Sequence, residues 1–220
     1  MKKYFVLLLL ALSFASCGTK YDYLDTGTSN PYFDGDMYAY LQSGSYNWDS
    51  IVKIIDRAQL QDVFHNDDIT FMGLTNHSIR AWLMQGGKGY EAGYRQIDDI
   101  PVAMCEALVL SLVIDGKMLR DDIERVVLDE KGNYTGGGRV CKTRYGNYIW
   151  LWTEQNPYMG VAGLGPVTIK MTTLSDDNRA HQVATNTIAS GDIQPRNGVV
   201  HSLEYSYRVD NIGNFLPYEE

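Results

Sequence analysis

The chain has 220 residues, with 19 basic and 27 acidic side chains. Residues 1–17 carry two of the lysines and no acid, so a chain without them keeps 17 basic groups against 27 acidic ones, a net charge of −10. This charge argues against a nucleic-acid partner, because phosphate binding needs a concentrated basic surface. With 45% hydrophobic and 21% charged residues, the chain can build a core, and the remaining length suits one large domain.

Residues 1–17 have the pattern of a secretory signal peptide. A lysine pair precedes the apolar stretch Tyr4–Phe14, which is too short to span a bilayer permanently. The small residues Ala15-Ser16 then precede Cys17, as in a bacterial lipobox. We therefore expect a diacylglyceryl lipid on Cys17 and a protein anchored in the cell envelope, at the surface of the outer membrane. The alternative is an ordinary signal peptide cut near Ala15 or Cys17.

Residues 18–33 are predicted to be a polar tether, because Gly, Thr, Ser and Asp are common in them. The domain is predicted to cover residues 34–210, and residues 211–220 are predicted to be a C-terminal tail. In the first half, apolar residues recur with the period of a helix over Asp34–Leu41 and from Ile51 to Ala58, with Asp49 as the expected cap of the second helix.

A buried strand is predicted next, over Ile69–Leu74. Thr75 or Asn76 is the expected cap of the following helix. A further helix, apolar all round and therefore deeply buried, is predicted to begin near Asp99 and to run to Leu112.

After residue 125 the apolar residues alternate as they do in strands. Arg139–Tyr145 and Tyr148–Trp152 flank Gly146-Asn147, which is a signal for a two-residue hairpin. Further strands are predicted over Val183–Ile188 and Val199–Tyr207. Helices followed by antiparallel strands, without an internal repeat, predict an α+β fold in one domain.

Cys105 and Cys141 are the cysteines beyond the signal segment. Thiols outside the cytoplasm can pair. Here one lies in an apolar helical pattern and the other in a strand pattern, which favours two buried free cysteines. The chain has no CxxC pair and no His/Cys cluster, so no metal site and no cofactor are predicted.

Two segments together resemble the fasciclin domain. Ile69–Asn76, with Thr70, Phe71, Thr75 and Asn76, is similar to the family's first motif, a strand that runs into a helix. Ile188–Leu203 is similar to the second motif, in which Asn197, Gly198, Val199, Val200 and His201 begin the closing strand. The resemblance covers roughly residues 34–208. It implies helices in the N-terminal half packed on an antiparallel β-sheet wedge from the C-terminal half.

The second motif also carries two local expectations. Asn197-Gly198 predicts a tight turn with positive φ. His201 falls on the same strand face as Val199 and Leu203, and we expect it to be a hydrogen-bonded structural histidine.

The segment near residues 131–166 is longer and more aromatic than a minimal fasciclin domain, and we interpret it as an elaborated hairpin. It contains the aromatic set Tyr145, Tyr148, Trp150, Trp152 and Tyr158. Tyr148, Trp150 and Trp152 share one strand face. That face is either core packing or an exposed platform on which sugar rings or a partner protein stack.

The resemblance implies a non-catalytic role in adhesion or ligand binding at the cell surface, with a glycan, an extracellular-matrix protein or another cell-surface protein as partner. The alternative is an accessory glycan-binding lipoprotein of an outer-membrane polysaccharide-uptake system. A hydrolase is the least favoured interpretation, since no catalytic motif is present and the four Asp-Asp pairs sit where carboxylates cap turns and helices.

Overall fold

The computed structural model describes residues 30–131, 134–161, 163–213 and 215–218. The predicted signal peptide, Cys17 and most of the predicted tether lie outside these residues. The residues from Pro31 onward form one compact unit. Its elements, in chain order, are β1 (Tyr32–Phe33), α2 (Met37–Ser43), α3 (Ser45–Arg57), α4 (Gln61–Asn66), β2 (Ile69–Gly73), α5 (Asn76–Leu83), α6 (Lys88–Glu91), the 3₁₀ turn η1 (Ile97–Asp99), α7 (Val102–Leu110), β3 (Val113–Asp115), η2 (Arg120–Asp122), β4 (Val127–Leu128), β5 (Tyr134–Gly136), β6 (Arg139–Lys142), β7 (Tyr148–Gln155), β8 (Val167–Leu174), β9 (Gln182–Pro195), β10 (Gly198–Leu203) and η3 (Val209–Ile212).

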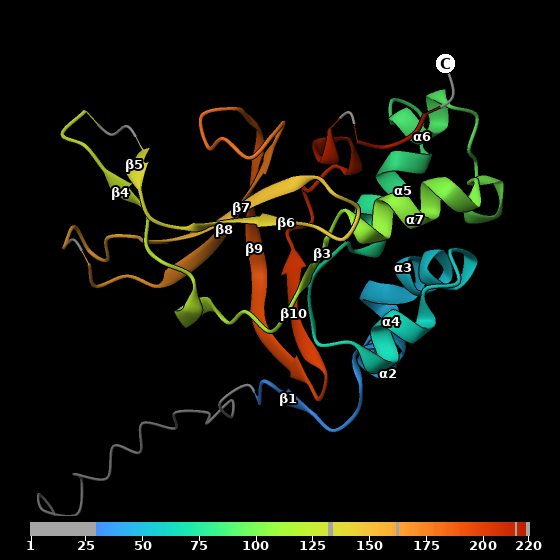
Figure 1. The fold of residues 1–220 in the computed structure, drawn as a ribbon, viewed down its shortest axis with the longest axis horizontal. Helices are drawn as coiled ribbons and strands as arrows, with labels where there is room; N and C mark the ends of the chain where they lie inside the picture. Colours follow the sequence, from blue (N-terminus) through green and yellow to red (C-terminus); the bar gives the residue numbers. More distant parts are fainter. Residues whose placement is uncertain (1–29, 132–133, 162, 214, 219–220) are drawn as a thin grey trace, which may run out of the picture. The chain divides into compact units, whose positions relative to one another are not determined.

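The main sheet has the strand order β3-β2-β10-β9-β8-β7-β6, and β1 adds to it beside β9 (Figure 1). β9 pairs with two strands along its length. Its first half pairs with β8 and its second half pairs with β10. The strands are antiparallel except at β2–β10 and β1–β9, which are parallel. The prediction of an antiparallel sheet built from the C-terminal half is therefore incomplete, because β2, from the first half, lies between β3 and β10 near one edge of the sheet.

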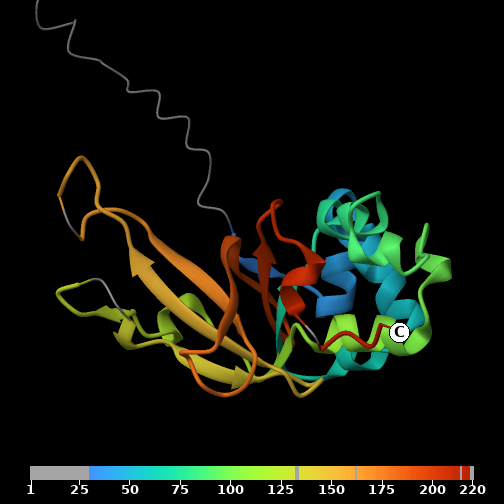
Figure 2. The same cartoon turned by 90° about the horizontal axis from the view of Figure 1, so that it is seen from above.

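The helices gather at one end of the sheet, and the β4–β5 hairpin and the far ends of β7 and β8 project at the other (Figures 1 and 2). The main core lies between the helices and the sheet. α7 contributes most of its residues to this core, as its all-round apolar sequence predicts. No helix in the described part of the chain is long and apolar enough to cross a bilayer.

The two fasciclin-like motifs are side by side in the sheet. β10 runs parallel to β2, with Val199 opposite Thr70 and Val200 opposite Phe71. All five residues of β2 are buried, as the apolar run predicts. Thr75 caps α5 by accepting a hydrogen bond from the Ser78 N–H, which settles the choice between the two predicted caps. The motif residues thus build the centre of the fold.

Two asparagine side chains, one from each motif, bond to the backbone of helices elsewhere in the chain. Asn76 accepts a hydrogen bond from the Ser50 N–H of α3 at 2.7 Å and donates one to the Tyr46 carbonyl at 2.8 Å. Asn197 accepts from the Met37 N–H at 2.7 Å, where α2 begins. It also donates to the carbonyls of Phe64 and Asp67, each at 3.0 Å, at the end of α4. Each motif therefore anchors helical backbone through a short amide side chain.

Gly198 is required for a different reason from the predicted one. It is not among the described glycines with positive φ, so the expected positive φ is wrong, although Arg196 and Asn197 do form a turn between β9 and β10. Instead, Gly198 is the first residue of β10, and a Cβ there would collide with the Ile69 carbonyl and the Met37 methyl group. The residue is small because β2 and α2 approach the backbone closely.

Several predicted boundaries differ from the structure. Tyr32 and Phe33, assigned to the tether, pair with Gln194 and Pro195. In the predicted tail, Leu216 is buried. Asp49 lies inside α3, which begins at Ser45, so it does not cap that helix. These residues are fixed by contacts with remote segments, which local patterns do not report.

The hairpin between β6 and β7 has a longer turn than predicted. Residues 143–147 connect the strands, and the Gly146 N–H donates to the Thr143 carbonyl at 3.0 Å. Asn147 turns inward instead of forming a two-residue loop. It is buried, and its amide donates to the Ser111 carbonyl at 3.3 Å.

Both described cysteines are free and buried, as predicted. Burial raises the pKa of the Cys105 thiol to about 11 and also raises the pKa of Cys141. Both side chains are therefore protonated thiols at neutral pH and behave as small apolar groups.

His201 is a buried, hydrogen-bonded structural histidine, as predicted. Its Nε2 bonds to the Met118 carbonyl at 2.9 Å, and its Nδ1 accepts from the Asp192 N–H at 3.2 Å. These partners require a neutral ring with its proton on Nε2. Burial is the main cause that lowers the pKa of His201 below its ordinary value.

We expect this histidine to make the fold sensitive to mild acid. Because the pKa is lower in the folded chain, the unfolded chain takes up the proton first as the pH falls below about 6.5. The contribution of neutral His201 to the free energy of unfolding is complete above that pH. It declines as the pH falls towards the pKa of the folded state, by up to about 1.4 kcal/mol per pH unit. Urea unfolding at several pH values between neutrality and pH 5 measures the slope. His201→Gln, which keeps a donor and an acceptor, should remove most of it, and an unchanged slope in this variant would contradict the assignment.

Candidate ligand-binding pocket

The two tryptophans of the predicted platform are buried. Trp150 is 1% exposed and Trp152 is 2% exposed, and they form a second apolar cluster with Leu174. Trp150 donates its indole N–H to the Gly137 carbonyl at 3.2 Å, and Trp152 donates to the Thr172 hydroxyl at 3.0 Å. The prediction of an exposed platform is therefore wrong, and the alternative interpretation of this face as core packing is confirmed.

The five aromatic residues also do not form one surface. Tyr145 lies in the turn before β7, and Tyr158 lies in the loop after β7, so both are exposed at opposite ends of that strand. Tyr148 is partly buried against the tryptophan cluster. The period of two correctly placed three rings on one face, but that face is covered by another part of the chain.

The cover is the β4–β5 hairpin, through Tyr134. Its ring lies edge-on to Trp150 at 5.5 Å between centroids and tilted against Trp152 at 5.2 Å. Tyr134 itself is 48% exposed. The hairpin therefore closes the tryptophan cluster and presents a new aromatic ring to the solvent beside it.

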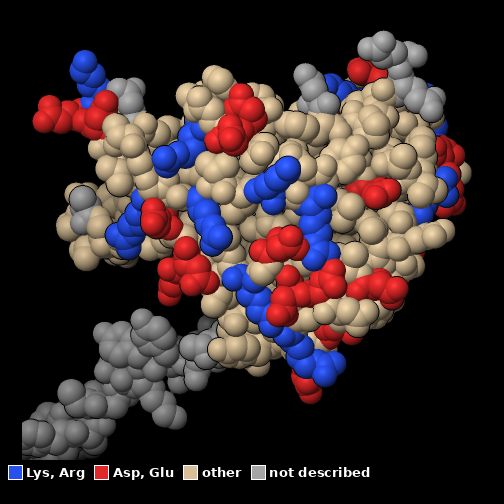
Figure 3. Space-filling view, in the orientation of Figure 1, with Lys and Arg blue, Asp and Glu red and all other residues tan. Residues whose placement is uncertain are grey.

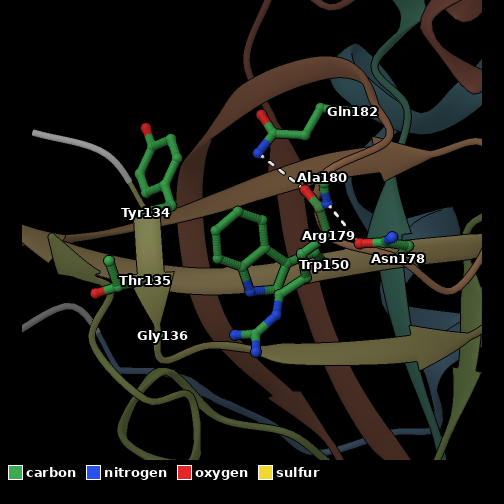
Figure 4. A pocket seen from close by; sticks show the side chains of 8 residues that line it. All are labelled: Tyr134, Thr135, Gly136, Trp150, Asn178, Arg179, Ala180 and Gln182. Carbon is green, nitrogen blue, oxygen red and sulfur yellow. Dashed lines mark hydrogen bonds between the residues drawn. The ribbon is translucent and has the colours of Figure 1, made fainter. Parts of the chain in front are cut away.

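A pocket of about 440 Å³ opens where this hairpin meets the loop between β8 and β9. In Figure 4, Trp150 lies in the middle of the pocket, with Tyr134 on one side, Asn178 on the other and the Arg179 guanidinium against the indole. The lining residues are Tyr134, Thr135, Gly136, Trp150, Asn178, Arg179, Ala180 and Gln182. They combine aromatic rings with hydroxyl, amide and guanidinium groups.

Arg179 links the two segments that line the pocket, the β8–β9 loop and the chain that follows β5. Its Nη1 donates to the Gly137 carbonyl at 2.7 Å, the same oxygen that accepts from Trp150. Its guanidinium carbon is 5.8 Å from the centre of the Trp150 ring, which is a cation–π distance. Gly137 is the one hydrogen-bond partner of this guanidinium among the described residues, so other N–H donors of Arg179 are available to a ligand.

The β8–β9 loop is shaped by its own hydrogen bonds. Asp176 accepts from the Asn178 N–H at 2.8 Å and pairs with His181 at 2.7 Å, and the hydrogen bond with His181 is the main cause that lowers the pKa of Asp176. Asn178 accepts from the Ala180 N–H at 3.0 Å. Gln182 donates to the Arg179 carbonyl at 3.1 Å. The wall that carries Asn178 and Arg179 is thus formed before any ligand arrives.

Sequence reasoning identified Trp150 but missed the other lining side chains. Tyr134 and Arg179 are remote in the chain, and each stands in a short, polar segment without a motif. Three of the four Asp-Asp pairs have their expected role in turns, whereas Asp67 and Asp68 instead pair with Arg144 and Lys117. Asp99 accepts from the Arg95 and Gln96 N–H groups, and Asp122 accepts from the Leu119 N–H.

A second depression of about 900 Å³ lies among α3, α5 and η1. Charged side chains of both signs line it, including Lys53, Arg80 and Asp98, together with Met84. Its lining contains no aromatic ring. Within the described ranges, no group of three or more His, Cys, Asp and Glu side chains is arranged to hold a metal ion.

Comparison with known proteins supports the fold. No model of a known family matches the chain, and no curated protein matches it. The solved structure of a FAS1 domain pair from the insect cell adhesion molecule fasciclin I is similar, with a TM-score of 0.51 and 10% sequence identity. The match covers 81% of this chain and 53% of that chain, so this chain spans about half the length of the domain pair. The fold of this chain is fasciclin-like.

Proposed function

We propose that this chain is a non-catalytic ligand-binding domain of the adhesion type, held in the cell envelope by a lipid on Cys17. The pocket over Trp150 is the observation that carries the proposal, and we place the ligand there. The fasciclin-like fold supports it, because the structural neighbour comes from a cell adhesion molecule. The signal-like N-terminus supports the location.

The chemistry of the lining is that of recognition. A cavity of about 440 Å³ falls within the range of small-ligand sites. Tyr134 offers a ring face, and Asn178, Gln182 and Arg179 offer polar groups around it. Apolar walls with a few convergent polar groups fix the orientation of a ligand and give specificity.

A glycan is the more specific candidate for this ligand. Sugar rings combine apolar faces, which pack on aromatic rings, with hydroxyl groups that pair with amides and guanidinium groups. Tyr134, Gln182 and Arg179 supply these partners on adjacent sides of one pocket. This favours the accessory glycan-binding role in polysaccharide uptake over a protein ligand.

A binding screen with matched variants tests the proposal. Soluble protein beginning at Gly18 is screened against glycans and cell-surface proteins, and Arg179→Ala and Gln182→Ala are compared with wild type. Loss of a charge-assisted hydrogen bond from Arg179 should weaken binding by about 10- to 100-fold, and loss of the neutral Gln182 amide by about 2- to 10-fold. Both lining residues are exposed, so the free energy of unfolding should change by less than about 1 kcal/mol.

Arg80→Ala and Gln85→Ala are the controls, since both residues are exposed and lie outside the pocket. They should bind like wild type. Equal losses in the pocket variants and the controls, or a ligand that binds all four variants as tightly as wild type, would contradict a site over Trp150.

A further inference from the structure

The loop between β7 and β8 has no charged side chain and exposes large apolar ones. It covers residues 156–166, with the sequence NPYMGVAGLGP. Met159 is 87% exposed, Leu164 66%, Tyr158 59% and Val161 51%. The loop projects from the end of the sheet away from the helices (Figures 1 and 2), and its tip shows no acidic or basic atoms in Figure 3. An uncharged apolar projection of this kind marks an interaction site.

Backbone hydrogen bonds define the conformation of the loop around Met159. Tyr158 and Val161 exchange two backbone hydrogen bonds, of 3.0 and 2.9 Å, around Met159 and Gly160. Both central residues have positive φ, 48° and 80°, so they form a type I′ turn. Asparagine and glycine are the usual residues of such turns. Met159 therefore occupies a strained conformation that fixes an apolar side chain at the tip, and such strain points to function.

Hydrogen bonds inside the loop also satisfy much of its backbone. The Asn156 N–H donates to the Pro166 carbonyl, and the Gly165 N–H donates back to the Asn156 carbonyl. The Gln155 amide donates to the carbonyls of Gly163 and Gly165 at 2.7 and 3.0 Å. Paired backbone groups lower the cost of leaving water for an apolar medium.

The charged side chains on the two strands that carry the loop neutralise each other. Glu154 and Lys170, on the two strands that carry the loop, pair with each other at 3.1 Å. Tyr158 suits the boundary of a bilayer, where an amphipathic ring sits at the level of the headgroups. Met159 and Leu164 suit the acyl region. An exposed, uncharged apolar loop fits a fluid surface that closes around it.

We propose that this loop inserts into the surface of a phospholipid bilayer and orients the domain on the membrane. The inference rests on the lipid anchor of the proposed function. Thirteen residues lie between Cys17 and Pro31, and the fourteen Cα–Cα steps reach at most about 50 Å when extended. An anchored domain therefore stays close to the bilayer. At that effective concentration a weak insertion is sufficient, and the loop would orient a domain that the two acyl chains of the anchor already hold at the membrane.

The test uses the full, lipidated chain in vesicles of phosphatidylethanolamine and phosphatidylglycerol. Met159→Cys is labelled with an environment-sensitive fluorophore, which is selective because Cys105 and Cys141 are buried. Emission should shift to shorter wavelength relative to the labelled soluble protein and should be quenched by spin-labelled lipids. The same label at Tyr46→Cys, 85% exposed on α3, should remain in water. Adding Leu164→Asp should abolish the shift while the chain stays on the vesicles.

A label at residue 159 that stays in water on vesicles would overturn the inference. So would shielding that occurs only when a partner protein is added, which would assign the loop to protein docking. A chain that does not float with vesicles would instead contradict the lipid anchor. In that case soluble protein held on nickel-chelating lipids by an N-terminal His tag gives the same reading of the loop. Pocket binding is measured separately on the soluble protein.

Discussion

Replacing Trp150 by alanine is expected to lower the free energy of unfolding by about 3–5 kcal/mol, the usual cost of removing a buried tryptophan. The indole is 1% exposed and lies against Trp152 at 5.5 Å and Tyr134 at 5.5 Å between ring centroids. Its removal leaves a cavity under the β4–β5 hairpin and frees the Gly137 carbonyl from one donor. Urea unfolding of wild type and variant measures the change.

Tyr145→Ala is the matched control, because it removes an exposed aromatic side chain from the same hairpin. It should cost less than about 1 kcal/mol. Similar small effects in both variants would mean that Trp150 is not a core residue, and the covered tryptophan cluster would then be wrong.

Asn197→Ala is expected to lower the free energy of unfolding by about 3 kcal/mol. The change removes one acceptor and two donor bonds at the point where α2, α4 and β10 meet. It leaves the Met37 N–H and the carbonyls of Phe64 and Asp67 without this partner, and a buried unsatisfied group costs about 1–3 kcal/mol. Chemical denaturation gives the value.

Asn47→Ala provides the comparison. Its side chain accepts an exposed hydrogen bond from the Tyr205 hydroxyl at 3.0 Å, so its loss should cost less than about 1 kcal/mol. If Asn197→Ala is as mild as Asn47→Ala, the motif asparagine does not join the helices to the sheet.

Local patterns in the sequence predicted the elements that depend on local physics. The apolar run of β2, the Thr75 cap and the alternation along β7 all follow from neighbouring residues. The short motifs also led to the fasciclin-like fold, although sequence identity to the similar structure is 10%. The short motifs were therefore sufficient to predict the fold class.

Remote contacts explain what the sequence did not predict. The parallel pairing of β2 with β10 joins residues about 130 positions apart, and β1 joins the sheet through Gln194 and Pro195. Gly198 is set by the close approach of Ile69 and Met37, not by its own φ. Spacing alone gives no sign of such contacts.

The pocket also depends on remote contacts that the sequence did not predict. The period of two placed Trp150 and Trp152 on one face but could not say what covers that face. Tyr134 and Arg179 do so from opposite sides, and they also complete the pocket. The candidate binding site of the aromatic segment is therefore a cavity at its edge, and not the flat platform that was predicted.

Nuclear magnetic resonance of the four tryptophan indole N–H groups, during titration with a ligand found in the screen, tests directly for a binding site in the pocket over Trp150. The chain has four tryptophans, and Trp150 alone lines the pocket over the β5 and β8–β9 segments. The Trp150 signal should shift most, and the signals of Trp48 and Trp82 in the helical core should stay unchanged. A saturating ligand that shifts Trp48 or Trp82 and leaves Trp150 unmoved would contradict a binding site in this pocket.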